Sequence, residues 1–387
     1  MVLIAAGIGA PARPQSTQHS DTRDEAMSLE RAGRVADAEV AWSALAKAHP
    51  QNAEPLAHMG LLEARQEHYP KAIALYRKAL TLDPAMPGLR MNLGLALFKD
   101  GQYKDAIQIF EPMLKTQPAS SPEADRLSIL IGMSRYGLGE YAQAVPYLKT
   151  AASHDVQNLP LRLTLAHSCL LSNQYQCVLD AYHEIIALNA ESAEADMLVG
   201  EALDEMKDSS GAIREFRAAI QANPKEPNAH FGLGYLLWTL KQYDEAAKEF
   251  RAELDNDPDH VQAMLYLADS EIQLEQMQAA EPLLLRALKL NPSSSMGHLD
   301  LGIVYGEAER NEDALRELRA AIKLTPDDVT AHFRLGQLYR SMGKAAEAKV
   351  EFDKAKSINK ATNAALLRVM SDASSKSVAP PAAANSK

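Results

Sequence analysis

Residues 227–260 read PNAHFGLGYLLWTLKQYDEAAKEFRAELDNDPDH, and this stretch decides the fold. Gly234 is its eighth residue, Ala246 its twentieth, Phe250 its twenty-fourth and Pro258 its thirty-second. Small residues at the eighth and twentieth places allow two helices to approach closely, where a larger side chain would overpack at a cost of roughly 1–3 kcal/mol. The proline ends the second helix. The stretch therefore predicts a helical hairpin that turns at 241–243.

The spacing of this stretch recurs along the chain in steps of 34 residues, with one step of 38. A small residue stands eighth in every unit: Ala26, Gly60, Gly94, Gly132, Ala166, Gly200, Gly234, Ala268, Gly302 and Gly336. A large apolar residue stands twenty-fourth: Trp42, Tyr76, Phe110, Leu148, Tyr182, Phe216, Phe250, Leu284, Leu318 and Phe352. The ten units are 19–52, 53–86, 87–120, 125–158, 159–192, 193–226, 227–260, 261–294, 295–328 and 329–362, with an insertion at 121–124. Repetition at this period predicts one stack of hairpins, not separate domains.

This pattern resembles the tetratricopeptide repeat, whose period is also 34 residues. The resemblance covers 19–362. It implies an all-α fold, a right-handed α-solenoid (superhelix) of tandem helix-turn-helix repeats. It also implies that the first helix of each repeat lines a concave groove through its second, fifth, ninth, twelfth and thirteenth residues.

The residues at these inward places are mostly apolar or aromatic, although a solvated surface would favour polar ones. The expected peptide-binding groove consists of Met91, Leu95, Phe98, Met133, Tyr136, His167, Glu201, Asp204, Phe231, Tyr235, Trp238 and Asp269. Phe231, Tyr235 and Trp238 form one stripe at i, i+4 and i+7. Exposed apolar patches with Trp and Tyr mark binding sites. The alternative is that the curvature of the superhelix buries these side chains against neighbouring repeats.

The sequence thus predicts a non-enzymatic protein–protein interaction scaffold that binds an extended peptide or amphipathic helix in an apolar and acidic groove. Glu201, Asp204 and Asp269 favour a partner that combines apolar anchors with basic residues. The alternative function is a cell-envelope assembly or secretion factor that contacts several partners. The sequence predicts no particular oligomeric state.

The composition excludes several other classes. Lys and Arg number 40 against 51 Asp and Glu, so the net charge of -11 argues against nucleic acid or an anionic membrane as the main partner. No apolar run reaches the 18 or so residues of an integral membrane segment. No phosphate loop, nucleophile motif or zinc-ligand spacing occurs. We therefore expect no catalytic residues, no cofactor and no metal.

The two ends of the chain differ from the repeats. Residues 2–8 are apolar and are followed by Ala10-Pro11-Ala12, so residues 1–18 form a signal-like or linker segment that lacks a positively charged start. A true signal peptide would place the protein in the periplasm or outside the cytoplasm, and a disordered apolar start would leave it cytoplasmic. Residues 363–370 are a candidate capping helix, and 371–387 read as a disordered tail.

A few polar residues stand in unusual places. Cys169 and Cys177 lie on facing helices near a turn, where either a disulfide or two buried thiols fit. Glu253 occupies a place that is usually a buried alanine, so it needs a partner, for which Arg286 and Lys289 are candidates. The fourth residue of three repeats is histidine (His230, His298 and His332), where the family often packs a large ring.

Overall fold

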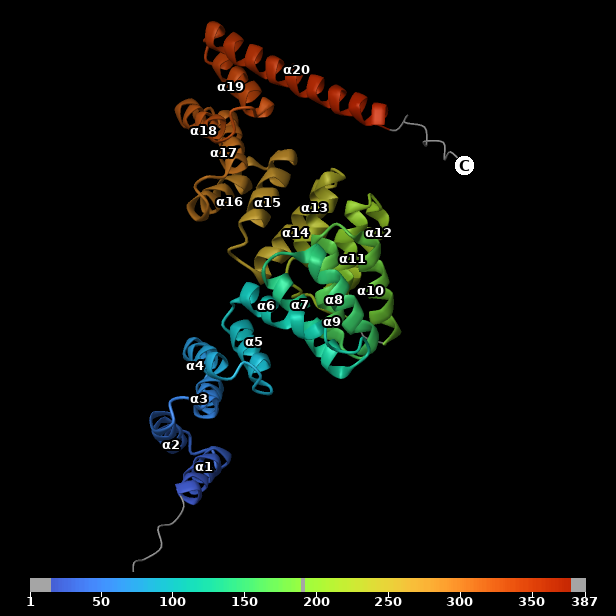
Figure 1. The fold of residues 1–387 in the computed structure, drawn as a ribbon. Helices are drawn as coiled ribbons and strands as arrows, with labels where there is room; N and C mark the ends of the chain where they lie inside the picture. The colour runs from blue at the N-terminus through green and yellow to red at the C-terminus, as the bar shows by residue number, and fades with distance from the viewer. Residues whose placement is uncertain (1–14, 189–191, 377–387) are drawn as a thin grey trace, which may run out of the picture. The chain divides into compact units, whose positions relative to one another are not determined.

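The computed structural model describes residues 15–188 and 192–376, and only the backbone at 15–21 and 363–376. These residues form twenty helices and no strand (Figure 1). The chain divides into two compact units, Met1–Ala190 and Glu191–Lys387. Two helices belong to each of the ten repeats, so the protein is an all-α solenoid of tandem hairpins. None of the helices in the described residues is long and apolar enough to span a membrane.

The first unit contains the hairpins of repeats 1–5. Its helices are α1 (Gln15–Arg31), α2 (Val35–Ala48), α3 (Ala53–Arg65), α4 (Tyr69–Leu82), α5 (Leu89–Lys99), α6 (Tyr103–Leu114), α7 (Pro122–Gly137), α8 (Tyr141–His154), α9 (Leu159–Leu171) and α10 (Tyr175–Ala187). The inserted residues 122–124 form the first turn of α7, and the Ser121 side chain caps this helix by accepting a hydrogen bond from the Ala124 amide.

The second unit contains the hairpins of repeats 6–10. Its helices are α11 (Ala193–Glu205), α12 (Ser209–Ala222), α13 (Ala229–Thr239), α14 (Tyr243–Asn256), α15 (Val261–Gln273), α16 (Met277–Leu290), α17 (Ser295–Glu307), α18 (Asn311–Leu324), α19 (Val329–Ser341) and α20 (Ala345–Lys376). Each first helix contacts the second helix of its own repeat, and the first helices of consecutive repeats also touch one another. The first helices α11, α13, α15, α17 and α19 therefore share one face of this unit.

A close contact between the eighth and twenty-fourth residues fixes the geometry of each hairpin. A Cβ atom added to Gly234 would lie 2.8 Å from the Phe250 ring, and one added to Gly60 would lie 2.6 Å from the Tyr76 ring. Phe250 and Tyr76 are fully buried, so neither ring has room to move. The eighth residue is small because the large twenty-fourth side chain lies directly over it.

The turn between the two helices is also the same in all ten repeats. The fifteenth residue always has a positive φ, whether it is glycine, as Gly101 (76°), or not, as Lys241 (61°) and Glu309 (55°). Glycine adopts this left-handed conformation without steric cost, and other residues adopt it as single residues in tight turns. The left-handed backbone conformation of the fifteenth residue is therefore the same in every repeat, whichever side chain that residue carries.

The expectations for the chain ends fall mostly outside the described residues. Residues 1–14 and 377–387, which include most of the signal-like segment and the end of the tail, are not described. Helix α20 runs without a break through 363–370, the candidate capping helix, and ends at Lys376, within the expected tail.

Cys169 on α9 and Cys177 on α10 form a disulfide, with their Cα atoms 5.7 Å apart. Of the two alternatives that the sequence left open, the structure thus contains the bonded one. The bond ties the two helices of repeat 5 together beside their turn.

Candidate functional site

The twelve expected groove residues fall into both units. Six lie in the first unit, on α5, α7 and α9: Met91, Leu95, Phe98, Met133, Tyr136 and His167. Six lie in the second unit, on α11, α13 and α15: Glu201, Asp204, Phe231, Tyr235, Trp238 and Asp269. Each unit therefore carries six of the expected residues.

The first unit brings together only part of its set. The Tyr136 ring lies 6.4 Å from the His167 ring and packs edge-on against Tyr141 at 5.4 Å. Phe98 packs edge-on against Tyr103 at 5.7 Å. Phe98 and Tyr136 therefore each pack against a ring of a neighbouring helix.

Met91 does not belong to an open groove. It is 9% exposed and joins the core cluster that includes Phe110, Leu127 and Ile131. The fifth places of repeats 6 and 8, Met197 and Leu265, are buried as well. Burial at these places is what the alternative of packing between repeats describes.

The second unit holds a continuous aromatic cluster on α13 and α15. Phe231, Tyr235 and Trp238 are all partly exposed, and successive rings in this stripe lie 6.3 Å and 6.1 Å apart. Tyr266 from the next repeat joins them, with its ring 5.2 Å from Tyr235 and 5.0 Å from Trp238, both edge-on. We call these four residues the aromatic cluster. Edge-to-face pairs of this kind hold rings in place.

Tyr266 was not among the expected groove residues. It stands sixth in its repeat, a place that the inward positions do not include. Its spacing from Asp269 could have indicated it, because Tyr266 lies one helical turn before Asp269 and both residues face α13. The Trp238 indole N–H donates to the Asp269 carboxylate at 2.5 Å, which fixes the orientation of the largest ring in the cluster.

Glu253 anchors the start of the helix that carries the stripe. Its buried carboxylate accepts hydrogen bonds from the backbone amides of Asn228 (3.2 Å) and Phe231 (3.1 Å), at the N-terminus of α13. Arg286 and Lys289 are therefore not its partners, and Arg286 pairs with Asp259 instead. The free amides at a helix N-terminus favour a negative charge, which explains how a carboxylate is tolerated in this core.

Carboxylates flank the aromatic cluster. Glu201 and Asp204 on α11 are partly buried, and burial raises the pKa of both groups. At Asp204 the nearby Lys207 opposes this shift and Glu205 adds to it. These acids are thus partly desolvated.

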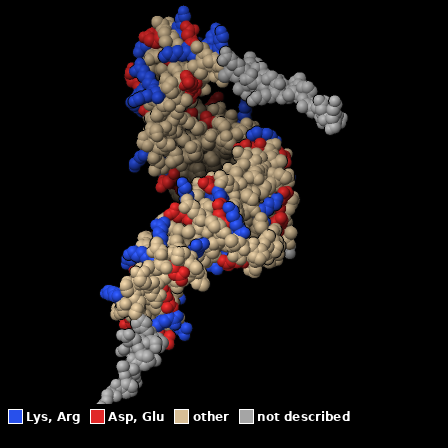
Figure 2. All heavy atoms as spheres, viewed as in Figure 1, with Lys and Arg blue, Asp and Glu red and all other residues tan. Residues whose placement is uncertain are grey.

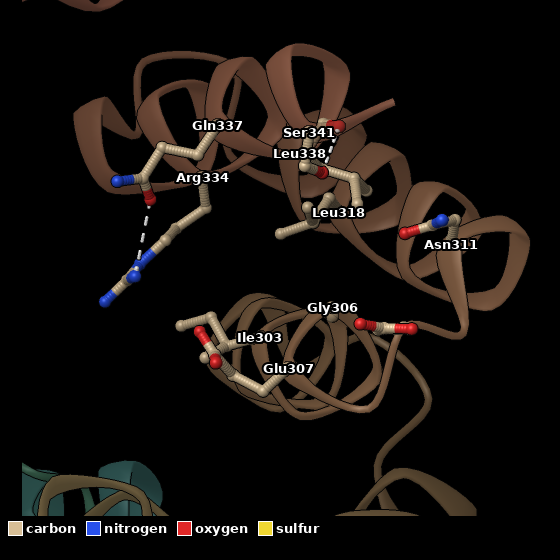
Figure 3. Close-up of a pocket in the computed structure, with 11 residues that line it drawn as sticks. Ile303, Gly306, Glu307, Asn311, Leu318, Arg334, Gln337, Leu338 and Ser341 are labelled. Atoms are coloured by element: carbon tan, nitrogen blue, oxygen red, sulfur yellow. Dashed lines mark hydrogen bonds between the residues drawn. The ribbon is translucent and has the colours of Figure 1, made fainter. Parts of the chain in front are cut away.

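Repeats 9 and 10 form a hollow of about 680 Å³ that the expected groove did not include. Figure 3 shows Arg334 and Gln337 of α19 on one side of it, and Ile303 and Glu307 of α17 on the other. Gly306 lies on this surface, and a Cβ atom added there would meet nothing within 4 Å. Gly306 is the twelfth residue of its repeat and leaves room for a side chain at the edge of the hollow.

No group of three or more His, Cys, Asp or Glu side chains within the described residues is placed to bind a metal ion. On the face seen in Figure 2, basic and acidic side chains alternate, without a continuous basic surface.

The family comparison agrees with these hairpins. One tetratricopeptide-repeat model matches residues 23–87, 179–227, 200–260, 231–295 and 299–359, and a second matches 63–128, so more than half of the chain is matched. The chain belongs to the tetratricopeptide-repeat family. This fold is typically a protein-interaction scaffold without enzymatic activity.

Solved tetratricopeptide-repeat proteins are similar over part of the chain. A crystal structure of MamA matches at 23% identity and a TM-score of 0.39, over 43% of this chain and 96% of that one. MamA from Desulfovibrio magneticus matches at 20% identity and a TM-score of 0.41, over 44% of this chain and 98% of that one. YrrB, described as a TPR protein with an unusual peptide-binding site, matches at 22% identity and a TM-score of 0.41. That match covers 46% of this chain and 92% of YrrB. Each match spans less than half of this chain.

Proposed function

We propose that this protein is a non-enzymatic scaffold that binds an extended peptide or amphipathic helix on the first-helix face of repeats 6–8. The observation that carries this proposal is the aromatic cluster of Phe231, Tyr235, Trp238 and Tyr266. Its rings are partly exposed on a face where a free solenoid would favour polar side chains.

The cluster has the properties of a binding hot spot. Its rings are held by one another and by the Trp238–Asp269 hydrogen bond, so little side-chain entropy is lost when a partner binds. An apolar side chain of the partner would cover the outer ring faces. This predicts that the partner contributes at least one apolar anchor.

The acids around the cluster specify the second feature of the partner. Glu201 and Asp204 lie one repeat before the stripe, and Asp269 lies one repeat after it. A lysine or arginine of the partner would add a positive charge beside these partly buried carboxylates. We therefore propose a partner with apolar anchors and basic residues.

A peptide-display selection tests this proposal. Fifteen-residue random peptides would be selected on the full chain, and affinities would be measured for the wild type, Tyr235→Ala and Leu285→Ala. Leu285 is a matched control because it is 47% exposed on the second helix α16. We expect Lys- or Arg-containing apolar peptides, with Tyr235→Ala weakening binding about tenfold or more and Leu285→Ala leaving it unchanged. Selected peptides that bind Tyr235→Ala and the wild type equally would contradict the proposal.

The disulfide favours a second candidate, a cell-envelope assembly or secretion factor. Disulfides persist mainly in oxidising compartments outside the cytoplasm. Thiol labelling of the protein taken from its native cells tests this candidate. Protected Cys169 and Cys177 would support it, and two freely alkylated thiols would exclude it.

A further inference from the structure

Asp300 on α17 is a buried acid whose carboxylate is incompletely hydrogen-bonded. The residue is 4% exposed, and its Oδ2 atom has no hydrogen-bond partner among the described residues. Buried polar groups are nearly always hydrogen-bonded, because an unpaired carboxylate away from water costs free energy. Packing alone therefore does not explain an acid in this place.

The position of Asp300 in its repeat shows which helices it lies between. In the second unit, the sixth residue of a first helix faces the first helix of the preceding repeat. The Tyr266 ring of α15 packs against Trp238 on α13, and Arg334 of α19 faces α17 across the hollow (Figure 3). Asp300 is the sixth residue of repeat 9, and the charge of Asp269 on α15 acts on it. Its carboxylate therefore lies between α17 and α15.

The charged groups around Asp300 leave it short of positive charge. Burial and the carboxylates of Asp269 and Asp328 raise the pKa of Asp300 well above its usual range, and the guanidinium of Arg334 only partly opposes them. Arg334 donates to the Gln337 side chain at 3.4 Å, as Figure 3 shows. A further cation beside Asp300 would stabilise its charged form.

Asp269 and two aromatic rings lie on the α15 side of Asp300. The Oδ2 atom of Asp269 accepts from the Trp238 indole, and its Oδ1 atom has a long contact of 3.4 Å with the Gln273 side chain. Asp269 is partly exposed, and a carboxylate oxygen can accept more than one hydrogen bond. The rings of Trp238 and Tyr266 lie beside it, 5.0 Å apart. This side of Asp300 thus combines a hydrogen-bond acceptor with aromatic surface.

These groups match the chemistry of a guanidinium. Arginine carries several N–H donors in a planar fork, stays charged and stacks on aromatic rings. The ammonium of lysine is a compact, strongly hydrated charge, which makes it less suited to a buried ion pair. Two carboxylates beside aromatic rings therefore favour arginine over lysine.

We propose that Asp300 and Asp269 form the binding site for an arginine side chain of the partner, between α15 and α17. The guanidinium contacts Asp269 at the surface, lies against the rings of the aromatic cluster and donates to the Asp300 carboxylate below. This inference rests on the proposed peptide binding, in which an apolar anchor covers the aromatic cluster. Packed helices lie roughly 8–10 Å apart and an extended chain advances about 3.3–3.6 Å per residue, so the arginine precedes or follows the anchor by about three residues.

Parallel peptide-display selections test this site. Fifteen-residue random peptides would be selected on the full chain of the wild type, of Asp300→Asn and of Glu307→Gln. Glu307 is the matched control, because it is an exposed acid two turns after Asp300 on the same helix. We expect the wild type and Glu307→Gln to select an arginine about three residues from the apolar anchor, and Asp300→Asn to select the anchor without it.

Two results would overturn the arginine site and leave the proposed function standing. One is an equal preference for arginine in the Asp300→Asn selection, and the other is selection of the anchor by the wild type without arginine or with lysine in its place. In both cases Tyr235→Ala would still weaken binding of the selected peptides. If the peptides bind Tyr235→Ala as tightly as the wild type, or if none is selected, the proposed function fails and the arginine site fails with it.

A double-mutant cycle on one selected peptide separates a binding role of Asp300 from a structural one. Replacing the arginine of the peptide by citrulline, which has a similar shape and no charge, should weaken binding to the wild type about tenfold or more. The same replacement should have little effect on binding to Asp300→Asn, whose free form should be more stable than the wild type in thermal unfolding. Additive losses, or a destabilised Asp300→Asn variant that binds the peptide unchanged, would overturn the proposal. Unchanged binding of the citrulline peptide to the wild type would overturn it without any protein variant.

Discussion

Two alanine substitutions in the same helix test why the eighth residue of each repeat is small. Gly302 and Gly306 lie one turn apart on α17. A Cβ atom at Gly302 would lie 2.7 Å from Cγ of Leu318 and 3.2 Å from its backbone nitrogen, and one at Gly306 would meet nothing within 4 Å. Both variants gain helix propensity of up to about 1 kcal/mol, because alanine replaces glycine.

The contact with Leu318 separates the two variants. Leu318 is 2% exposed and part of the new contact is with its backbone, so rotating the side chain cannot relieve the overlap. Overpacking of this kind costs about 1–3 kcal/mol. We therefore expect Gly302→Ala to be about 1–3 kcal/mol less stable than Gly306→Ala, with Gly306→Ala at or above the wild type.

Urea unfolding followed by circular dichroism gives the global comparison, and hydrogen exchange within α17 and α18 gives the local one. The local readout matters because a repeat array can unfold in parts. Equal stabilisation by both substitutions would refute the view that close approach at the eighth residue sets the hairpin geometry.

Three further predictions concern buried polar groups and the disulfide. Glu253→Gln should lower the hydrogen-exchange protection of the α13 amides and reduce the stability by about 0.5–2 kcal/mol, because the helix loses a charged cap. Unchanged protection would show that the cap is dispensable. The Cys169–Cys177 bond closes a short loop, so its reduction should lower the stability by about 2–3 kcal/mol. Thermal unfolding with and without reductant measures this loss, and identical unfolding curves would contradict the prediction. Burial, together with the Asp269 charge and against the pull of Arg334, raises the pKa of Asp300 well above its usual range. Asp300→Asn should therefore stabilise the protein by about 1–3 kcal/mol at pH 7. This gain should vanish below about pH 4, where Asp300 is neutral in both the folded and the unfolded state. A variant that is less stable than the wild type at pH 7 would disprove this prediction.

The hairpins could be predicted from the sequence because their determinants are local and steric. The eighth and twenty-fourth residues touch within one repeat, so a small residue sixteen places before a large apolar one can be found in the sequence itself, as at Gly234 and Phe250. The same reasoning does not reveal backbone partners. The sequence suggested a cationic partner for Glu253, but in the structure two backbone amides of α13 bind it. Every residue except proline has a backbone amide, so the sequence does not indicate which amides are free to bind a carboxylate.

The candidate site could be predicted only in part, because exposure depends on the neighbouring repeat. Met91 and Phe231 both occupy the fifth place of their repeats, yet Met91 is in the core and Phe231 is partly exposed. Tyr266 joins the cluster from the sixth place of its repeat, which was not among the expected inward places. The hollow is lined by residues of α17, α18 and α19, so its existence depends on how three helices pack, which the sequence of one repeat does not indicate.

The most direct test of the central claim is site-specific photocrosslinking in the cells that naturally produce the protein. A benzophenone amino acid would replace Tyr235 in the aromatic cluster or, as the control, Leu285 on the second-helix side. The account predicts a discrete crosslinked partner protein from position 235 and none from position 285. A partner crosslinked from position 285 alone would contradict it.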